Sequence, residues 1–128
     1  MHDAFGLRAT LMFDLAAGEY HANVVLAVLS GRALLACPDG FADPGVVEAI
    51  AALYPHAAQL SAAERAGFAG NAICVRGDTV WMSATAAAAL AAGTRRTLRQ
   101  AGMTVAHVEL AAIEAAGGSL RCCVAELF

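Results

Sequence analysis

The sequence predicts an α+β fold in which one β-β-α-β unit occurs twice. Short apolar runs bounded by turn residues alternate with one helical pattern, in the same order in both halves of the chain. Landmarks of the first half also recur about 48 residues later, with Val24 matching Ala72 and His56 matching Thr104. Repeats of this kind are typical of circular or stacked arrays of identical units. With 128 residues, the chain has room for a single domain, over 1–128.

The first unit covers about residues 20–61. We expect strands over 24–29, 32–37 and 56–60 and a helix over 46–53. Ser30-Gly31 is typical of the tight turn of a hairpin. Asp43 and Pro44 predict the helix start, and Pro55 predicts its end.

The second unit covers about residues 70–110 and has the same order. We expect strands over 72–75, 79–82 and 103–110 and one alanine-rich helix over 85–100. Ser83 is a natural N-cap for this helix, and Gly102 ends it. Between the units, Ser61 and Glu64 have the spacing of a capping box, which predicts a short helix within 61–67.

Two flanking strands, 8–15 and 119–128, fall outside the units. Each would belong to a neighbouring unit, so the array is expected to be open at both ends. Open strand edges are usually covered in native proteins. The sequence therefore predicts either a fragment of a larger array, completed by an N-terminal half, or a homo-oligomer.

The composition agrees with a covered surface and excludes several classes of partner. Charged residues are 15% of the chain and apolar residues 59%, which indicates that a partner subunit or further chain hides some surface. The cluster of Arg95, Arg96 and Arg99 is interpreted as a solvated helix face, because the net charge is −3 and no nucleic-acid pattern accompanies it. No apolar run is long enough for a membrane span, and the start lacks the form of a signal peptide.

The cysteines favour a reducing compartment. None of the four stands in a C-x-x-C pair, so we expect no disulfide framework and a cytoplasmic protein. His56 and His107 share no metal-ligand spacing with a carboxylate or cysteine, so neither a metal nor another cofactor is assigned.

His21 and Cys122 are the candidate catalytic residues. A cysteine with a histidine elsewhere in the chain is a known arrangement for covalent catalysis. Alone the pair is a weak signal, because a histidine at a strand end is usually solvated and a cysteine on an apolar strand usually belongs to the core.

Several motifs strengthen this interpretation. They stand in one order along nearly the whole chain: Tyr20–Val24, Phe68–Ala72, Met82–Ala84, Ile113-Glu114, Gly117–Cys122 and Ala125–Phe128. Together they resemble the motifs of the arginine deiminase and amidinotransferase (pentein) superfamily, most closely those of its citrulline-utilisation hydrolases. The resemblance implies an α/β propeller of five units, of which this chain would supply about two.

The resemblance also implies a mechanism. Cys122 would attack the central carbon of an arginine- or citrulline-like small molecule, and His21 would serve as general acid and base. A covalent thiouronium intermediate would follow. Water would release it in a hydrolase, and a second amine would release it in an amidinotransferase.

Five further residues are predicted to contact substrate: Asn23, Asn71, Gly118, Ser119 and Arg121. Many relatives carry an aspartate where this chain has Asn23, and an amide supplies no negative charge, so Asn23 suits a neutral ureido group better than a guanidinium. Arg121 has two interpretations, a contact to a substrate carboxylate or an ordinary surface position. Asn71 is expected to satisfy buried backbone groups near the site.

The remaining candidates are assigned structural roles. Glu114 is expected to cap a turn, and Trp81 to serve as a core or interface anchor. Cys37 and Cys74 are expected in core strands, and Cys123 in the core on the side facing away from Cys122.

Two alternatives remain open. The acidic residues that the superfamily uses precede the matched region, so the chain is also consistent with a catalytically incomplete remnant that acts as an oligomeric or interaction module. A thiol-based redox or thiol-binding domain is the third interpretation.

Overall fold

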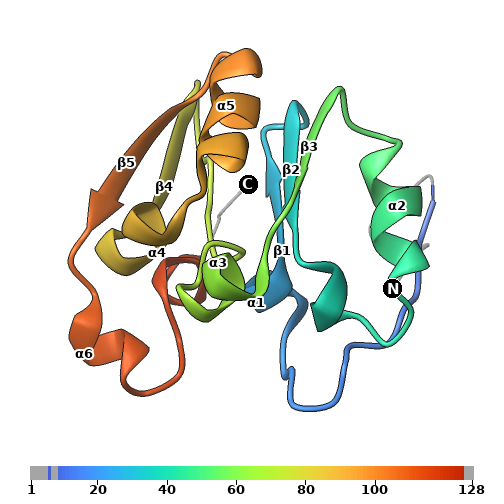
Figure 1. Ribbon diagram of the computed structural model, residues 1–128, viewed down its shortest axis with the longest axis horizontal. Helices are drawn as coiled ribbons and strands as arrows, with labels where there is room; N and C mark the ends of the chain where they lie inside the picture. Colours follow the sequence, from blue (N-terminus) through green and yellow to red (C-terminus); the bar gives the residue numbers. More distant parts are fainter. Residues whose placement is uncertain (1–5, 7–8, 126–128) are drawn as a thin grey trace.

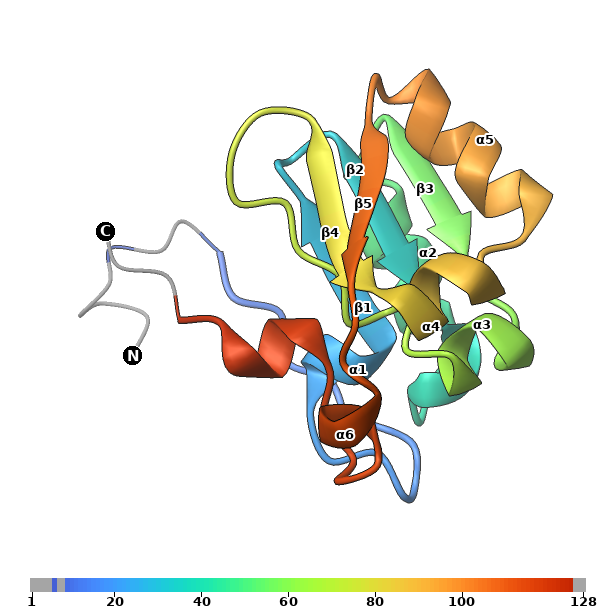
Figure 2. The same cartoon turned by 90° about the vertical axis from the view of Figure 1, so that its left-hand side faces the viewer.

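The computed structural model describes Gly6 and residues 9–125. Across Figure 1 from left to right, the sheet of β4 (Thr79–Ser83) and β5 (Thr104–Val108) comes first, helix α5 (Ala92–Gln100) and the sheet of β1 to β3 lie in the middle, and helix α2 (Gly45–Ala51) lies on the right. Figure 2 shows α5 to one side of the strands, where it contacts β3 and β2. The predicted α+β class is confirmed.

The first unit forms a three-stranded sheet. Its strands are β1 (Leu26–Leu29), β2 (Ala33–Ala36) and β3 (His56–Gln59), with β2 in the centre. β1 runs antiparallel to β2, and β3 runs parallel to it. The predicted hairpin turn is present, because Ser30 and Gly31 have φ angles of 49° and 65°, as a two-residue turn with both residues left-handed requires.

The second unit repeats this topology in reduced form. β4 and β5 are parallel, like β2 and β3. The strand predicted over 72–75 is reduced to an isolated antiparallel bridge between Ile73 and Trp81. Gly77 turns the chain with a φ of 69° between the two partners.

The helix predicted over 85–100 is wrong as one element, because two helices are present, α4 (Ala84–Ala89) and α5. The break is at Leu90 and Ala91, where the buried carboxylate of Glu64 accepts hydrogen bonds from the Ala91 N–H at 3.0 Å and the Thr94 hydroxyl at 2.6 Å. These contacts hold the backbone N–H of the N-cap Ala91 and the side chain of Thr94 in the first turn of α5, so a new helix starts there. Glu64 also completes the predicted capping box with Ser61, at the start of α3 (Ala62–Ala66).

The strand predicted over 24–29 starts later than expected. Residues Ala22–Val25 form the short helix α1, for which His21 is the N-cap, and β1 begins at Leu26. The side chain of Asn71 donates a hydrogen bond to the carbonyl oxygen of Asn23, so this part of the backbone needs no partner strand.

Neither flanking strand is present in the described part of the chain. Within 9–15, only Leu15 forms an isolated bridge, to Phe41, and residues Leu120–Cys123 form the 3-10 helix η3. The backbone N–H of Arg121 donates to the Asn71 side chain, and that of Cys122 donates to Ser119, so local contacts replace a strand partner. Arg8 and residues 126–128 lie outside the described residues.

The core lies mainly around β2 and between the two sheets. All four residues of β2 are fully buried, as are Val80 and Met82 of β4. Cys37 is a core residue as predicted, whereas Cys74 is half-buried and Cys123 is exposed, which corrects two predictions. Cys123 reaches the surface because it stands on a 3-10 turn and not on a buried strand.

The smaller elements connect the layers. They are η2 (Pro38–Gly40) before α2 and α6 (Ala111–Glu114) before the C-terminal turn. In the described part of the chain, no helix combines the length and apolar character that crossing a bilayer requires.

Candidate active site

Asn71 is the residue around which the candidate site is built. Its side chain is 1% exposed and it follows Phe68, whose φ of 64° closes a tight turn. Gly70 allows this turn to press against α1, because a Cβ at Gly70 would stand 2.4 Å from the carbonyl oxygen of Val24. The turn therefore delivers Asn71 to the end of the helix that carries the histidine motif.

The side chain of Asn71 joins three segments. Its Nδ2 donates to the carbonyl oxygen of Asn23 at 2.7 Å, and its Oδ1 accepts from the backbone N–H of Arg121 at 2.8 Å. The same Nδ2 lies 3.3 Å from Cys122 Sγ. A single buried amide thus holds the histidine motif and the cysteine turn together, in the backbone-satisfying role expected from the sequence.

Cys122 stands on η3 with its side chain exposed, beside residues of both motifs. Its thiol lies 4.0 Å from the Oδ1 of Asn23, at the outer limit for a hydrogen bond that involves sulfur. Gly118 packs against it, because a Cβ at Gly118 would be 3.6 Å from the Cβ of Cys122. The thiol is therefore reachable from solvent and has two amides beside it.

Glu114 fixes the glycine-rich turn that precedes the cysteine. Its carboxylate accepts from the hydroxyl of Ser119 at 2.9 Å and from that of Thr85 at 2.7 Å. Burial raises the pKa of Glu114, but hydrogen bonds from Ser83, Thr85 and Ser119 outweigh it, so this pKa lies below its ordinary value. Glu114 therefore has the predicted turn-capping role and also anchors the turn to α4 through Thr85. The sequence did not predict this second contact, because Thr85 is distant from Glu114 along the chain.

Tyr20, the residue before His21, connects the histidine motif to the glycine-rich turn that precedes Cys122. The ring of Tyr20 packs edge-on against the His21 ring with centroids 5.2 Å apart, and the Tyr20 hydroxyl donates to the carbonyl oxygen of Gly117. In the described part of the chain no hydrogen bond joins His21 directly to Cys122. The histidine motif meets the cysteine turn through its other residues, because Tyr20 bonds the Gly117 carbonyl and Asn23 lies 4.0 Å from the Cys122 thiol.

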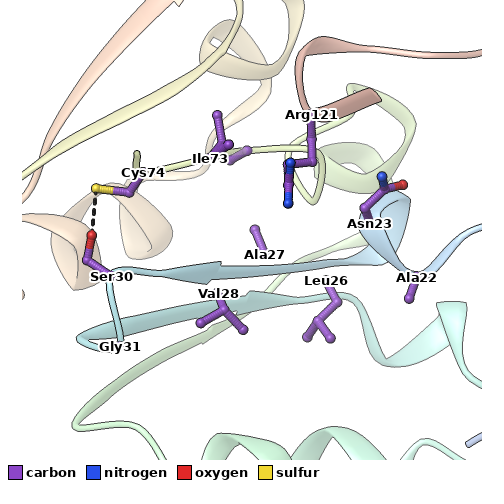
Figure 3. A pocket seen from close by; sticks show the side chains of 11 residues that line it. Ala22, Asn23, Leu26, Ala27, Val28, Ser30, Gly31, Ile73, Cys74 and Arg121 are labelled. Carbon is purple, nitrogen blue, oxygen red and sulfur yellow. Dashed lines mark hydrogen bonds between the residues drawn. The ribbon is translucent and has the colours of Figure 1, made fainter. Parts of the chain in front are cut away.

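A cavity of about 400 Å³ opens beside this cluster. Figure 3 shows it between β1 and the segment around Ile73, with Asn23 and Arg121 at one end. At the other end, the Ser30 hydroxyl donates to Cys74 Sγ at 3.0 Å. Asn23 and Arg121 therefore share a cavity wall, while Gly118, Ser119 and Cys122 stand on the turn next to Arg121.

The cavity wall includes residues that sequence reasoning did not select for the site. The sequence predicts a core strand position for Cys74 and only a hairpin turn for Ser30. Ser30 and Cys74 meet because the two hairpins lie side by side. The internal repeat is the sequence signal that could have predicted this contact. Among the described residues, no group of three or more histidine, cysteine or acidic side chains is placed to hold a metal ion.

Residues 10–128 match the family model for the eukaryotic N,N dimethylarginine dimethylhydrolases. The chain belongs to this family. The match covers both halves of the site, from the histidine motif to the cysteine turn, and confirms the superfamily predicted from the motifs. The comparison with curated proteins gave no match.

Solved structures share the fold. The N-terminal domain of ArgZ, an arginine dihydrolase from the ornithine-ammonia cycle in cyanobacteria, solved with its product, is 27% identical with a TM-score of 0.66. That match covers 80% of this chain and 36% of the ArgZ domain. A complex of AgrE with ornithine and NAD+ is 24% identical with a TM-score of 0.65, covering 80% of this chain and 14% of AgrE. The chain thus spans about a third of the ArgZ domain that it matches.

Proposed function

We propose that the chain carries the cysteine and histidine portion of a hydrolase that cleaves C–N bonds in arginine- or citrulline-like small molecules. The observation that carries this proposal is the buried Asn71 amide, which contacts both the Asn23 carbonyl and the Cys122 thiol. These groups come from the two motifs in which the family places a histidine and a nucleophile. The proposal assigns Cys122 as the nucleophile and His21 as the general acid and base.

For an arginine-like substrate, the reaction begins with attack of the Cys122 thiolate on the central carbon of the guanidinium group. His21 donates a proton to the departing nitrogen, which leaves as ammonia or an amine, and a covalent S-alkylthiouronium remains on Cys122. His21 then takes a proton from water as the water attacks the same carbon. The C–S bond breaks, and the thiolate and a urea-type product are released.

The structures of ArgZ support this chemistry by analogy. They include the domain with its product, a cysteine mutant with substrate, and an asparagine variant covalently bound to a reaction intermediate. These matches are 26–27% identical to this chain. They concern a domain of which this chain spans 36%, so turnover by the present chain is part of the proposal.

The proposed substrate contacts follow the cavity. Asn23 would face the reacting group, and Arg121 would bind a substrate carboxylate across the same wall. Gly118 and Ser119 would shape the turn beside the thiol, and Asn71 would hold its backbone. Because the Asn23 amide carries no negative charge, a neutral ureido group is the better partner for it. A side-by-side assay in which the intact enzyme turns over arginine faster than citrulline would contradict this preference.

The proposed nucleophile can be tested because the chain contains a matched control next to it. Cys122 and Cys123 are adjacent and both exposed, so general thiol reactivity should affect both. We expect 2-chloroacetamidine and its neutral analogue 2-chloroacetamide each to alkylate Cys122 several-fold faster than Cys123, with the stronger discrimination by the neutral reagent because Asn23 carries no negative charge. Peptide mass spectrometry over a time course measures both rates in one sample.

Competition makes the test specific for a substrate pocket. Arginine or citrulline in excess should slow alkylation at Cys122 and leave Cys123 unchanged. Equal rates at the two cysteines, or no protection by either amino acid, would mean that the chain has no pocket for a guanidino or ureido group.

The second candidate is a catalytically incomplete module of the same fold. The observation that favours it is the coverage of 36% of the ArgZ domain, since further units would be needed to supply acidic groups. A partner that carries an N-terminal half, or a second copy of the chain, would then complete the array. Selective alkylation of Cys122 in the isolated chain would argue against this candidate.

A further inference from the structure

The imidazole of His21 has few constraints of its own. The backbone of His21 is fixed, because the residue is the extended N-cap of α1 and its carbonyl accepts from the Val24 N–H at 3.1 Å. In the described part of the chain, no hydrogen bond or ion pair holds the imidazole, and its ring packs edge-on against that of Tyr20. The torsion that turns a histidine ring has a broad range. The orientation of the His21 ring therefore depends on the residue before it.

Tyr20 can set this orientation because it is anchored on both sides. Glu19, directly before it, has a side chain that is 6% exposed, and its carboxylate pairs with Arg65 of α3. At the far end of the ring, the Tyr20 hydroxyl donates to the carbonyl oxygen of Gly117. The tyrosine is 53% exposed, so burial alone does not hold its ring. The hydroxyl contact thus fixes the ring against which the imidazole packs.

The acceptor of this contact belongs to a well-anchored turn. Gly117 has a φ of 93°, which suits glycine, and its N–H donates to the carbonyl oxygen of Glu114 at 3.0 Å. The carboxylate of Glu114 is bound in turn by the hydroxyl of Thr85 on α4. Cys122 follows in the same segment, on η3. The Tyr20 hydroxyl therefore joins the residue next to the histidine to the turn that leads to the thiol.

We propose that Tyr20 is a positioning residue that holds the imidazole of His21 in one orientation relative to the cysteine turn. The phenol does not touch the reacting atoms. It acts through the histidine, because the imidazole must present a ring nitrogen first to the leaving group and then to water. The inference rests on the proposed function, since it concerns the acid and base of that reaction.

The proposed chemistry separates this role from a purely structural one. Turnover needs a proton for the departing nitrogen and the removal of a proton from water, and His21 serves both steps. Alkylation of Cys122 by 2-chloroacetamide releases chloride, which leaves without a proton. A misoriented imidazole should therefore slow turnover far more than alkylation. A disordered cysteine turn should slow both.

Tyr20→Phe removes the hydroxyl and keeps the aromatic ring. We expect kcat for citrulline to fall by roughly fivefold to tenfold, a part of the ~10²–10⁴-fold that general acid–base catalysis contributes. KM and the rate of Cys122 alkylation should change little. Tyr20→Leu removes the ring as well and should lower kcat further. Tyr54→Phe is the matched control, because Tyr54 is the other tyrosine of the chain and packs against the core, and it should behave like the wild type.

Nuclear magnetic resonance gives a readout that does not depend on turnover. In the wild type, nuclear Overhauser effects should connect the ring protons of Tyr20 and His21, and the aromatic ring should shift the His21 signals from their random-coil positions. In Tyr20→Phe these effects should weaken, while the amide spectrum of the folded chain is retained. Tyr54→Phe should leave the His21 signals unchanged.

Two results would overturn the proposal. One is a Tyr20→Phe variant whose His21 signals and Overhauser effects match those of the wild type. The other is an active wild type for which Tyr20→Phe leaves kcat unchanged, or lowers it only in proportion to Cys122 alkylation. A wild type that is inert toward both substrates and unselective toward the alkylating reagents would contradict the proposed function alone, and the resonance comparison would still decide the role of Tyr20.

Discussion

The Nδ2 of Asn71 lies 3.3 Å from the Sγ of Cys122, across a sequence separation of 51 residues. The same nitrogen donates to the Asn23 carbonyl, and the Oδ1 accepts from the Arg121 N–H. The position of the thiol therefore depends on an amide that must donate on one side and accept on the other. This dependence can be measured separately from overall stability.

Asn71→Ala should destabilise the fold and disorder the cysteine turn. It removes the partners of a backbone carbonyl and a backbone N–H, and each unsatisfied buried group costs about 1–3 kcal/mol. We expect a lower free energy of unfolding in urea and slower alkylation of Cys122 relative to Cys123. A variant with unchanged stability would show that these backbone groups find water or other partners.

Asn71→Asp keeps the size of the side chain and adds a negative charge, so it tests the effect of charge near Cys122 apart from the effect of shape. The carboxylate can still accept from Arg121, but it cannot donate to Asn23 or to the sulfur, and its negative charge disfavours the Cys122 thiolate. Alkylation of Cys122 at neutral pH should therefore slow by more than tenfold, while Cys123 changes less. Equal slowing at both cysteines would indicate a general loss of structure instead.

Gly70→Ala should be much more damaging than an alanine at another glycine. The new Cβ would meet the Val24 carbonyl oxygen at 2.4 Å and the Cα of Val25 at 3.0 Å, both backbone atoms that cannot move alone. We expect a loss of about 1–3 kcal/mol in the free energy of unfolding. Gly93→Ala in α5 is the control, because nothing lies within 4 Å of its Cβ and alanine favours a helix by about 0.5–1 kcal/mol. Similar effects of the two substitutions would contradict the packing of the turn on α1.

Glu114→Gln should loosen the turn before Cys122 without unfolding the chain. The amide keeps one acceptor oxygen but puts an NH2 where the carboxylate accepts from Ser119 or Thr85. We expect slower amidine alkylation of Cys122 and little change in the urea midpoint. Ser119→Ala, which removes one of the two contacts, should give a smaller effect in the same direction. An effect on stability alone would contradict a role in positioning the turn.

Glu64 should make stability depend on acidity. Burial raises the pKa of Glu64, but hydrogen bonds from Thr94, Ser61 and Ala91 outweigh it, so the folded-state pKa lies below the ordinary value of 4.5. A lowered pKa means that the stabilising contribution is present above about pH 4.5 and is lost as the pH falls through the folded-state value. Urea unfolding between pH 7 and pH 3 should show this decrease, and Glu64→Gln should flatten part of it. A pH dependence identical in the variant would remove Glu64 as its source.

Much of the fold was predictable because it is encoded locally. The hairpin at Ser30-Gly31, the capping box of Ser61 and Glu64 and the helix end at Gly102 each depend on residues within one turn of the chain. The repeat of these signals predicted two β-β-α-β units. The first half has the expected order over β1, β2, α2 and β3, whereas the second half has a bridge at Ile73, then β4, two helices and β5.

The errors arose where a distant side chain overrides local preference. The alanine-rich run 85–100 favours one continuous helix. The carboxylate of Glu64, from another element, instead binds the Ala91 N–H, and a second helix starts there. The apolar pattern of 119–128 favours a strand, yet Asn71 takes the Arg121 N–H, and the described part of this segment forms a 3-10 turn. Propensity cannot anticipate such contacts because they depend on segments that meet only after folding.

The residue types available for the site could be predicted from the sequence. The order of the motifs selected His21, Asn23, Asn71 and Cys122 and placed the chain in its superfamily, since side-chain identity is fixed along the chain. The folded structure was needed to show that one buried amide joins these motifs and that the Trp81 side chain is 41% exposed. Packing of one unit against the next sets both features, because hydrogen bonds and burial between distant segments exist only in the folded chain.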